Sequence, residues 1–344
     1  MPEGRDRSID LRSFKRTPIK SSAELIRIGP LFKEGLPPVL VEALESLNLA
    51  TWAENNLPLI EDLLKKHGGI LFRKFGGEGQ EGMQRFVTAT RMEVMNYMEG
   101  ATPRKALGGN VYTSTEFPSE QMIALHNENS YVMSWPMKVC FGCVVEPVDR
   151  GETPIADVRE VLKRITPSVR RRFEEKGYML ARTFSQHLGL PWKESFKVSS
   201  KDELENYCRK ARIEFEWTDE DRLKTKQVRP AIATHPWTHE QVWFNHIAFW
   251  HVSSLEKGLR EQLLASYSPD EIPYNTYYGD GSLIEDGVVE ELRQAYDSET
   301  VKFTWKRGDL LLLDNMLVAH GRSPYSGPRK IIVTLAQAYT RTDI

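Results

Sequence analysis

Short apolar runs recur along the chain and predict buried strands. Most consist of β-branched and aromatic residues and are bounded by glycine or polar residues, which is typical of strands rather than helices. The run at 309–315 contains four consecutive leucines, so we expect a strand that is buried on both faces. The predicted strands are residues 68–75, 111–117, 138–146, 301–305, 309–315 and 330–337.

Between these strands the apolar spacing changes to that of amphipathic helices. From residue 158 on, valine, leucine and isoleucine recur at i, i+3, i+4 and i+7, and Asp157 is well placed as the N-cap. Thr166-Pro167 predicts the start of a second helix, and residues 228–246 resemble a hairpin around the sequence HPWTHEQ. Further helices are expected at residues 39–66, 79–98, 201–211, 253–266 and 286–296.

These elements predict one domain that is mostly β with flanking helices. Residues 1–35 are polar and irregular, and we expect an extended lead-in there. No linker-like break, internal repeat or low-complexity segment divides residues 36–344, so this range is expected to fold as a single domain.

The composition and charge of the chain argue against several classes of function. The 344 residues carry a formal net charge of -2, which argues against a dedicated nucleic-acid binder. Three cysteines in a chain of this length indicate a reducing compartment. The N-terminus lacks the apolar region of a signal peptide, and no window is apolar enough for a membrane span. We therefore expect a cytoplasmic protein without nucleic-acid or membrane partners.

The segment His126-Asn127-Glu128 is the first candidate for metal chemistry. If the segment is extended, residues i and i+2 point to the same face, with their Cα atoms about 6.6 Å apart. An imidazole and a carboxylate can then reach one ion.

Far down the chain, His320 follows the predicted strand at 309–315 and supplies a second imidazole. Two histidines and one carboxylate form the facial triad of non-haem iron(II) oxygenases, whereas a closed zinc site requires a fourth protein ligand. Arg329 begins the last predicted strand, and its planar guanidinium suits the distal carboxylate of a 2-oxoglutarate co-substrate. The sequence thus predicts a site built from His126, Glu128, His320 and Arg329.

Two other groups of metal-ligand residues fit structural roles better. Cys140 and Cys143 are three residues apart on a predicted strand and face opposite ways, so they cannot share a zinc ion. His235 and His239 are separated by Pro236, which disfavours a helical metal-binding face. We expect His235 to be a hydrogen-bonded core histidine.

With these motifs, the chain resembles the taurine/2,4-D dioxygenase superfamily, and within it the branch of syringomycin-biosynthesis-type aspartyl hydroxylases and related amino-acid oxygenases. The resemblance runs from GGILFRKF to KIIVTLAQ and includes the stretches HNENSY, GETP, HPWTHEQVWFN and RGDLLLLDNMLVAHGRSPYSGPRK. It implies a double-stranded β-helix (jelly roll, cupin-like) core. It also implies Fe(2+) held by His126, Glu128 and His320, and 2-oxoglutarate held by Thr153 and Arg329, with O2 as co-substrate.

The implied reaction is hydroxylation of an sp3 carbon of an amino acid, either free or tethered to a carrier protein. Arg322 and Asn127 are candidate substrate-binding residues, and further polar contacts are considered at Arg104, Asn110, Thr115 and Asn129. Two alternatives stay open on the residues alone. One is a non-catalytic binding protein on the same scaffold, and the other is a zinc hydrolase that uses the same three ligands.

Overall fold

The centre of the protein is an eight-stranded sheet. The computed structural model describes residues 24–33, 35–95, 99, 106–108, 111–113, 117–185, 189–218, 221–268 and 271–341. The strand order in this sheet is β1-β2-β3-β16-β7-β19-β5-β4. The strands are β1 (Ile26–Pro30), β2 (Val39–Ala43), β3 (Gly69–Arg73), β16 (Leu310–Asp314), β7 (Ser134–Val145), β19 (Lys330–Thr340), β5 (Val111–Thr113) and β4 (Ala106–Gly108).

The four leucines of β16 explain why this sheet is buried on both faces. Successive side chains of a strand point to opposite faces. Leu310 and Leu312 therefore join one hydrophobic core, while Leu311 and Leu313 join the other. β16 pairs antiparallel with both β3 and β7, so all five of its residues are buried.

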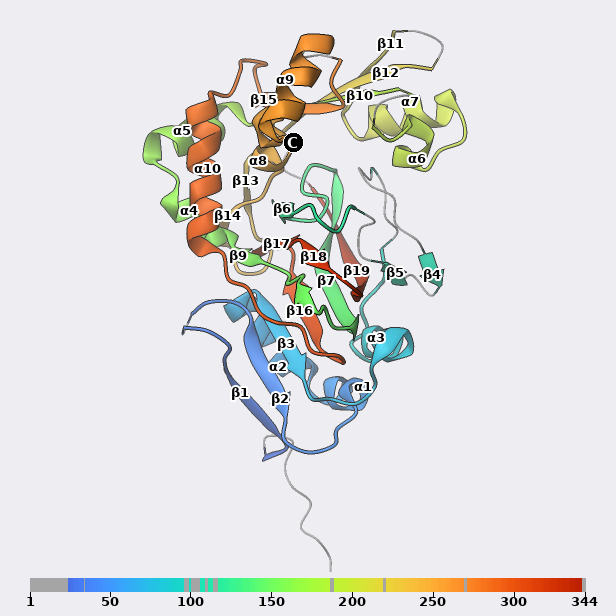
Figure 1. Cartoon of the computed structure of the whole chain (residues 1–344), viewed down its shortest axis with the longest axis vertical. Coiled ribbons are helices and arrows are strands. Elements are labelled where there is room, and N and C mark those ends of the chain that lie inside the picture. The colour runs from blue at the N-terminus through green and yellow to red at the C-terminus, as the bar shows by residue number, and fades with distance from the viewer. Residues whose placement is uncertain are drawn as a thin grey trace, which may run out of the picture.

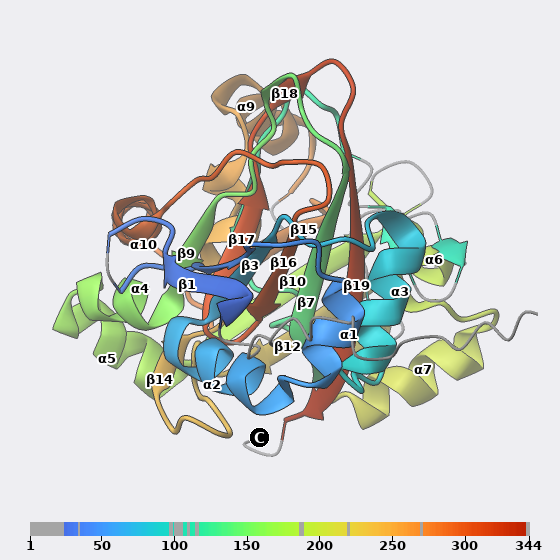
Figure 2. The same cartoon turned by 90° about the horizontal axis from the view of Figure 1, so that it is seen from below.

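Helices cover one face of the large sheet, as Figure 2 shows from below. They are α1 (Leu49–Glu54), α2 (Leu57–His67) and α3 (Gly79–Ala89). Their apolar sides, including Trp52, Leu64 and Phe86, pack with Phe72 and Leu312 of the sheet. This face therefore holds a core of its own, separate from the layer that carries the candidate chemistry.

A second, three-stranded sheet belongs to the core on the opposite face. Its order is β6 (Ile123–His126), β17 (Val318–Arg322) and β9 (Ile155–Asp157), all antiparallel. The helices α4 (Val158–Arg164), α5 (Pro167–Lys176) and α10 (Asp286–Glu299) lie together at one side of the molecule (Figure 1). Val158 of α4, Val289 of α10 and Val318 of β17 belong to the core that Leu311 shares.

Most of the long segment between β9 and β16 forms the end of the molecule opposite β1 and β2 (Figure 1). It contains a four-stranded sheet and a small hydrophobic cluster around Phe196, Leu204 and Leu223. The strands are β11 (Glu214–Trp217), β12 (Leu223–Arg229), β10 (Tyr178–Phe184) and β15 (Tyr274–Tyr278). The helices are α6 (Trp192–Phe196), α7 (Lys201–Lys210), α8 (Ile247–Trp250), η3 (Val252–Ser254) and α9 (Lys257–Ser266). Two small pairs complete the fold, β13 (Ile232–Thr234) with β14 (Gln241–Trp243) and β8 (Asp149–Arg150) with β18 (Tyr325–Ser326).

Three predictions differ from the structure. The lead-in is not irregular throughout, because Ile26–Pro30 forms β1 and pairs with β2. The helix predicted at 39–66 begins instead with β2, whose buried valines fit an inner strand beside β3. Residues 301–305 alternate as predicted, but only Val301 is paired, through a single bridge to Ile155. Alternation can place Phe303 and Trp305 in the core without a neighbouring strand.

The other strand and helix predictions agree with the structure apart from their ends, and the hairpin at 228–246 is β13–β14. The helix predicted at 79–98 stops at Ala89 in α3, and only Val111–Thr113 of residues 111–117 is assigned to a strand. Among the described residues, none of the helices has both the length and the apolar character that a bilayer crossing requires.

Leu312 provides a test of the doubly buried strand. Leu312→Ala should lower the free energy of unfolding by about 2–5 kcal/mol, because the side chain is fully buried in the core between the large sheet and the helices α1 to α3. Leu283→Ala is the control, since Leu283 is 72% exposed and its change should stay within about 0.5 kcal/mol. Urea denaturation followed by circular dichroism measures both, and equal stabilities of the two variants would contradict the assignment.

Candidate metal centre

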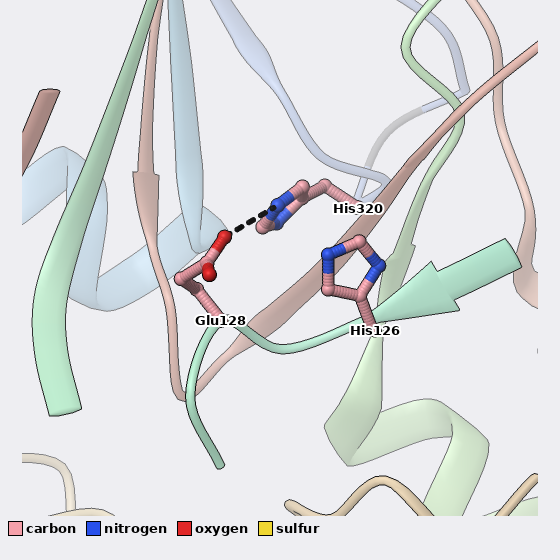
Figure 3. Close-up of side chains that lie close together, drawn as sticks. All are labelled: His126, Glu128 and His320. Carbon is pink, nitrogen blue, oxygen red and sulfur yellow. Dashed lines mark ion pairs between the residues drawn. The ribbon is translucent and has the colours of Figure 1, made fainter. Parts of the chain in front are cut away.

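His126, Glu128 and His320 converge at one point between the two facing sheets (Figure 3). Each offers one ligand atom, and these atoms all lie within 4.8 Å of one another. Nε2 of His320 is 3.8 Å from Oε2 of Glu128. Among the residues that the structure describes, this is the single group of three or more histidine, cysteine or acidic side chains arranged to hold a metal ion.

The pairing of two strands brings the histidines together. His126 ends β6 and stands directly opposite His320 of β17 in the antiparallel register. Their rings are 4.7 Å apart between centroids. Gly321 allows this approach, because a Cβ atom there would lie 2.5 Å from the carbonyl oxygen of Ile123.

The protonation of His126 suits a metal ligand. Its Nδ1 is 2.9 Å from the carbonyl oxygen of Ala124, which can only accept a hydrogen bond. Nδ1 therefore carries the proton, and the lone pair on Nε2 is available to a cation. Two imidazoles and the buried carboxylate of Glu128, which is 3% exposed, form a donor set that fits a divalent ion with positions left for other ligands.

A small pocket joins this centre to the two predicted co-substrate residues, Thr153 and Arg329. The wall from the three-stranded sheet carries His126 and His320, and the wall from the large sheet carries apolar side chains such as Phe141. Its lining residues are Ile123, His126, Phe141, Thr153, His320, Gly321, Arg322, Arg329, Ile331 and Val333. The structure thus brings Thr153 and Arg329 together with the metal-binding group, as the sequence predicts.

Arg329 has the geometry of an anion-binding residue. Its Nε donates a hydrogen bond of 2.9 Å to the carbonyl oxygen of Gly151. Within the described part of the chain, no residue accepts a hydrogen bond from its two terminal nitrogens and no carboxylate pairs with it. Burial, together with the nearby Arg322, lowers the pKa of Arg329 to about 10, so the group still carries its charge at neutral pH.

Thr153 can add a second donor in the same pocket. The side chain is 2% exposed, and its Oγ1 accepts a hydrogen bond of 3.1 Å from Nε1 of the buried Trp305. The indole cannot accept a hydrogen bond, so the hydroxyl proton of Thr153 is available to an anion. Trp305 thereby orients a residue that the sequence identified only through resemblance.

Arg322 and Asn127, the two predicted substrate-binding residues, are engaged with the protein backbone. The guanidinium of Arg322 donates to the carbonyl oxygens of Phe117, Pro118 and Gln121, at 2.9, 2.5 and 2.9 Å. The amide of Asn127 donates to the carbonyl oxygen of Asn315 at 2.7 Å. Arg322 therefore holds the segment before β6 through its backbone. Asn127 connects its own segment to the turn between β16 and β17. Arg104, Asn110 and Thr115 lie outside the described residues.

Two residues near His126 were missed from the sequence. The ring of Phe249 in α8 packs 4.8 Å from the His126 ring, and the ring of His246 lies 5.7 Å away. Nδ1 of His246 is 2.6 Å from the hydroxyl of Ser130, and burial lowers the pKa of His246 well below its ordinary value. Both follow the β13–β14 hairpin, but their sequence spacing carries no signal for contact with His126.

The structural interpretations of the remaining cysteines and histidines hold. Cys140 and Cys143 belong to different cores on the two faces of β7. His235 is fully buried, and its Nε2 lies 3.0 Å from Oδ2 of Asp314. The other oxygen of Asp314 accepts from the N–H groups of Met316 and Leu317, so this pair anchors the turn that leads to His320.

Known proteins match most of the chain. The family described as Taurine catabolism dioxygenase TauD, TfdA family matches residues 33–335. The chain is 37% identical over 276 residues to the dapdiamide synthesis protein DdaC of Enterobacter agglomerans, covering 80% of this chain and 84% of DdaC. It is 30% identical over 293 residues to the clavaminate synthase-like protein At3g21360 of Arabidopsis thaliana, with 81% and 84% covered.

Solved structures share the fold at lower sequence identity. PvcB of Pseudomonas aeruginosa superimposes with a TM-score of 0.55 at 15% identity, covering 94% of each chain. PvcB is an Fe, alpha-ketoglutarate dependent oxygenase from an isonitrile synthetic pathway. At this level of identity the likeness concerns the fold.

Metal binding tests the three-residue group. His126→Ala, Glu128→Ala and His320→Ala should each weaken Fe(II) binding by more than about tenfold, because even residues that only orient ligands contribute that much. Anaerobic titration calorimetry measures the affinity, and circular dichroism checks that the variants remain folded. The exposed His239 supplies a matched control, His239→Asn, which should bind as the wild type does. Wild-type affinity in all three alanine variants would show that the group holds no metal.

Proposed function

Because the chain belongs to the taurine catabolism dioxygenase TauD, TfdA family, we propose that it oxidises an sp3 carbon of an amino acid or an amino-acid derivative. The family makes it a non-haem iron(II)- and 2-oxoglutarate-dependent oxygenase with O2 as the second co-substrate. Our proposal extends to the reaction, to the substrate, and to the residues that bind iron and 2-oxoglutarate.

We assign the iron ligands to His126, Glu128 and His320. The donor set supports this choice, because two imidazoles and one carboxylate leave open positions for a chelating co-substrate and O2. The tautomer of His126, fixed by the Ala124 carbonyl, supports it as well. When bound, the iron supplies the activation of O2 that C–H oxidation requires, and the chain supplies position and environment.

We assign the distal carboxylate of 2-oxoglutarate to Arg329 and Thr153. The observation that carries this proposal is the unused side of the Arg329 guanidinium in the pocket that also contains His126 and His320. A planar guanidinium can donate two parallel hydrogen bonds to a carboxylate, and the Thr153 hydroxyl can donate a third. A dicarboxylate bound there would also supply a counter-charge to this partly buried cation.

The protein's own part in the reaction is orientation and exclusion of water. The apolar side chains of Phe141, Ile331 and Val333 line one wall of the co-substrate pocket and disfavour water there. Phe249 packs against His126 and adds a large apolar side chain beside the buried His246. A dry site strengthens the interaction between Arg329 and a carboxylate and protects a reactive centre from side reactions.

The two alternatives considered from the sequence lose support. A zinc hydrolase needs no cation for a carboxylate at the position of Arg329, and a passive binding protein needs no open metal centre. Membership of a dioxygenase family argues against both. The facing eight- and three-stranded sheets are consistent with the double-stranded β-helix that we propose for the core, with residues between β9 and β16 as its insertion.

For the substrate, the relatives provide the support. DdaC is a dapdiamide synthesis protein and the plant relative is clavaminate synthase-like, so we place this enzyme in natural-product biosynthesis. We propose an amino acid, free or tethered to a carrier protein, with hydroxylation as the reaction. Arg322 and Asn127 donate to backbone carbonyl oxygens, so we assign the substrate's polar groups to neither of them.

Arg329 provides the test of co-substrate binding. Arg329→Ala should weaken 2-oxoglutarate binding by about 1.5–3 kcal/mol, or about 10- to 150-fold, the range for hydrogen bonds to a charged group. Iron affinity should remain. Anaerobic titration of the iron-loaded protein with 2-oxoglutarate measures this directly.

Lys330 is the matched control, since it is the adjacent cation and its side chain is exposed. Lys330→Ala should bind 2-oxoglutarate as the wild type does. Arg329→Lys should bind with intermediate affinity, because it keeps the charge but loses the planar fork. If Lys330→Ala weakens 2-oxoglutarate binding and Arg329→Ala does not, Lys330 and not Arg329 binds the distal carboxylate.

The substrate class is tested by succinate formation. The iron-loaded enzyme is incubated with 2-oxoglutarate, O2 and individual amino acids, both free and loaded on a carrier protein. We expect one of them to stimulate succinate release and to gain one oxygen atom by mass spectrometry. Stimulation by a sulfonate, a phenoxyacetate or a lipid, with none by any amino acid, would reject the substrate assignment and leave the enzyme class intact.

A further inference from the structure

The side chain of Asn315 makes two buried hydrogen bonds to the backbone of Glu128. It lies in the turn between β16 and β17 and is 0% exposed. Its Oδ1 accepts a hydrogen bond of 2.7 Å from the backbone N–H of Glu128. Its Nδ2 donates to the carbonyl oxygen of the same residue at 2.8 Å and to that of Pro136 at 2.8 Å. Both amide hydrogens are therefore used, and the peptide groups flanking Glu128 are held from one side.

The main chain of Asn315 is itself anchored. Its N–H donates to the carbonyl oxygen of Met137 in β7 at 2.8 Å, which ties the turn to the large sheet. Its carbonyl oxygen accepts from the amide of Asn127 at 2.7 Å. Asn315 therefore connects the residue before Glu128, the backbone of Glu128 and the large sheet through contacts that are all buried.

Glu128 needs such support because it is not part of a strand. β6 ends at His126, and Glu128 lies in a turn whose next residue, Asn129, has a φ of 56°. A strand residue is held by the ladder bonds of its neighbour, and a turn residue lacks that restraint. The amide of Asn315 accepts from the N–H and donates to the C=O of one residue, as a neighbouring strand would. This contact restrains rotation of the Glu128 backbone, and so fixes the direction of its carboxylate.

We propose that Asn315 is the positioning residue for the carboxylate ligand Glu128. This inference rests on the proposed function, because it requires Glu128 to bind the metal. Residues that orient ligands without touching the metal commonly change metal affinity by 10- to 100-fold. Asn315 acts through hydrogen bonds to the ligand's backbone, so its loss should appear as weaker metal binding in a protein that remains folded.

The first experiment compares Asn315→Asp with the wild type. The variant keeps the shape and the acceptor but loses both donated bonds. We expect the affinity for Mn(II), measured by electron paramagnetic resonance and expressed per folded molecule, to fall by about 10- to 100-fold. Asn275→Asp is the matched control, a buried asparagine of β15 that accepts from the N–H of Val252 at 2.9 Å. It should keep wild-type Mn(II) affinity.

A double-mutant cycle separates positioning from general stability. In the Glu128→Ala background there is no carboxylate to position, so adding Asn315→Asp should cause no further loss of Mn(II) affinity. An equal loss in both backgrounds would overturn the proposal, because Asn315 would then act on the centre without Glu128. Wild-type Mn(II) affinity in the single variant would also overturn it.

A second variant keeps the test valid if Asn315→Asp does not fold. Asn315→Ala introduces no charge and should show the same loss of affinity. If neither Asn315 variant folds while Asn275→Asp does, Asn315 holds the fold rather than the ligand and the proposal is wrong. If wild-type protein itself binds no Mn(II), the metal assignment fails, and this result is distinct from failure at Asn315 alone.

Discussion

The antiparallel pairing of β17 with β6 is the contact on which the candidate centre depends. It sets His320 opposite His126, and only a glycine at position 321 allows the two strands to approach this closely. A metal ion requires its ligands within a few tenths of an ångström of their final places. Flexible side chains would lose that precision, so the pair of strands must be held before an ion arrives. The large sheet provides this rigidity, because β16 and β7 are buried on both faces and cannot shift without opening a core.

The same constraint explains why buried polar groups surround the centre. Asp314 and Asn315 are consecutive residues with separate partners, His235 for the first and Glu128 for the second. Burying such groups is unfavourable unless each finds a hydrogen-bond partner, and these do. The turn between β16 and β17 therefore has one strongly favoured conformation. This turn determines where β17 begins, and thus where His320 lies.

The sequence predicted the strand and helix content well where one local pattern dominated, as in the leucine run of β16 and the helix that follows Asp157. It predicted that His126, Glu128 and His320 converge, because ligand chemistry restricts the residue types. It failed at β2, where a short inner strand and a helix have the same apolar run. It also missed Asn315 and Phe249, because each contact depends on a pairing between distant segments. Arg322 shows the reverse case, since proximity in sequence to His320 suggested a substrate contact while its hydrogen bonds go to backbone carbonyls.

Arg322 and Arg329 differ in their hydrogen-bond partners, and this difference fits the ligands that we propose for the pocket. Both guanidinium groups line the same pocket, and burial lowers the pKa of each. The two terminal nitrogens of Arg322 donate to three carbonyl oxygens, whereas Arg329 donates to one carbonyl through Nε, which leaves its terminal nitrogens for the proposed carboxylate. A partly buried cation without an anion is unfavourable, so this arrangement favours a ligand that brings a carboxylate. The carboxylate of Glu128 beside the two imidazoles has the opposite need, for a cation. A divalent metal and a dicarboxylate bring equal and opposite charge, so together they satisfy both needs without changing the net charge of the pocket.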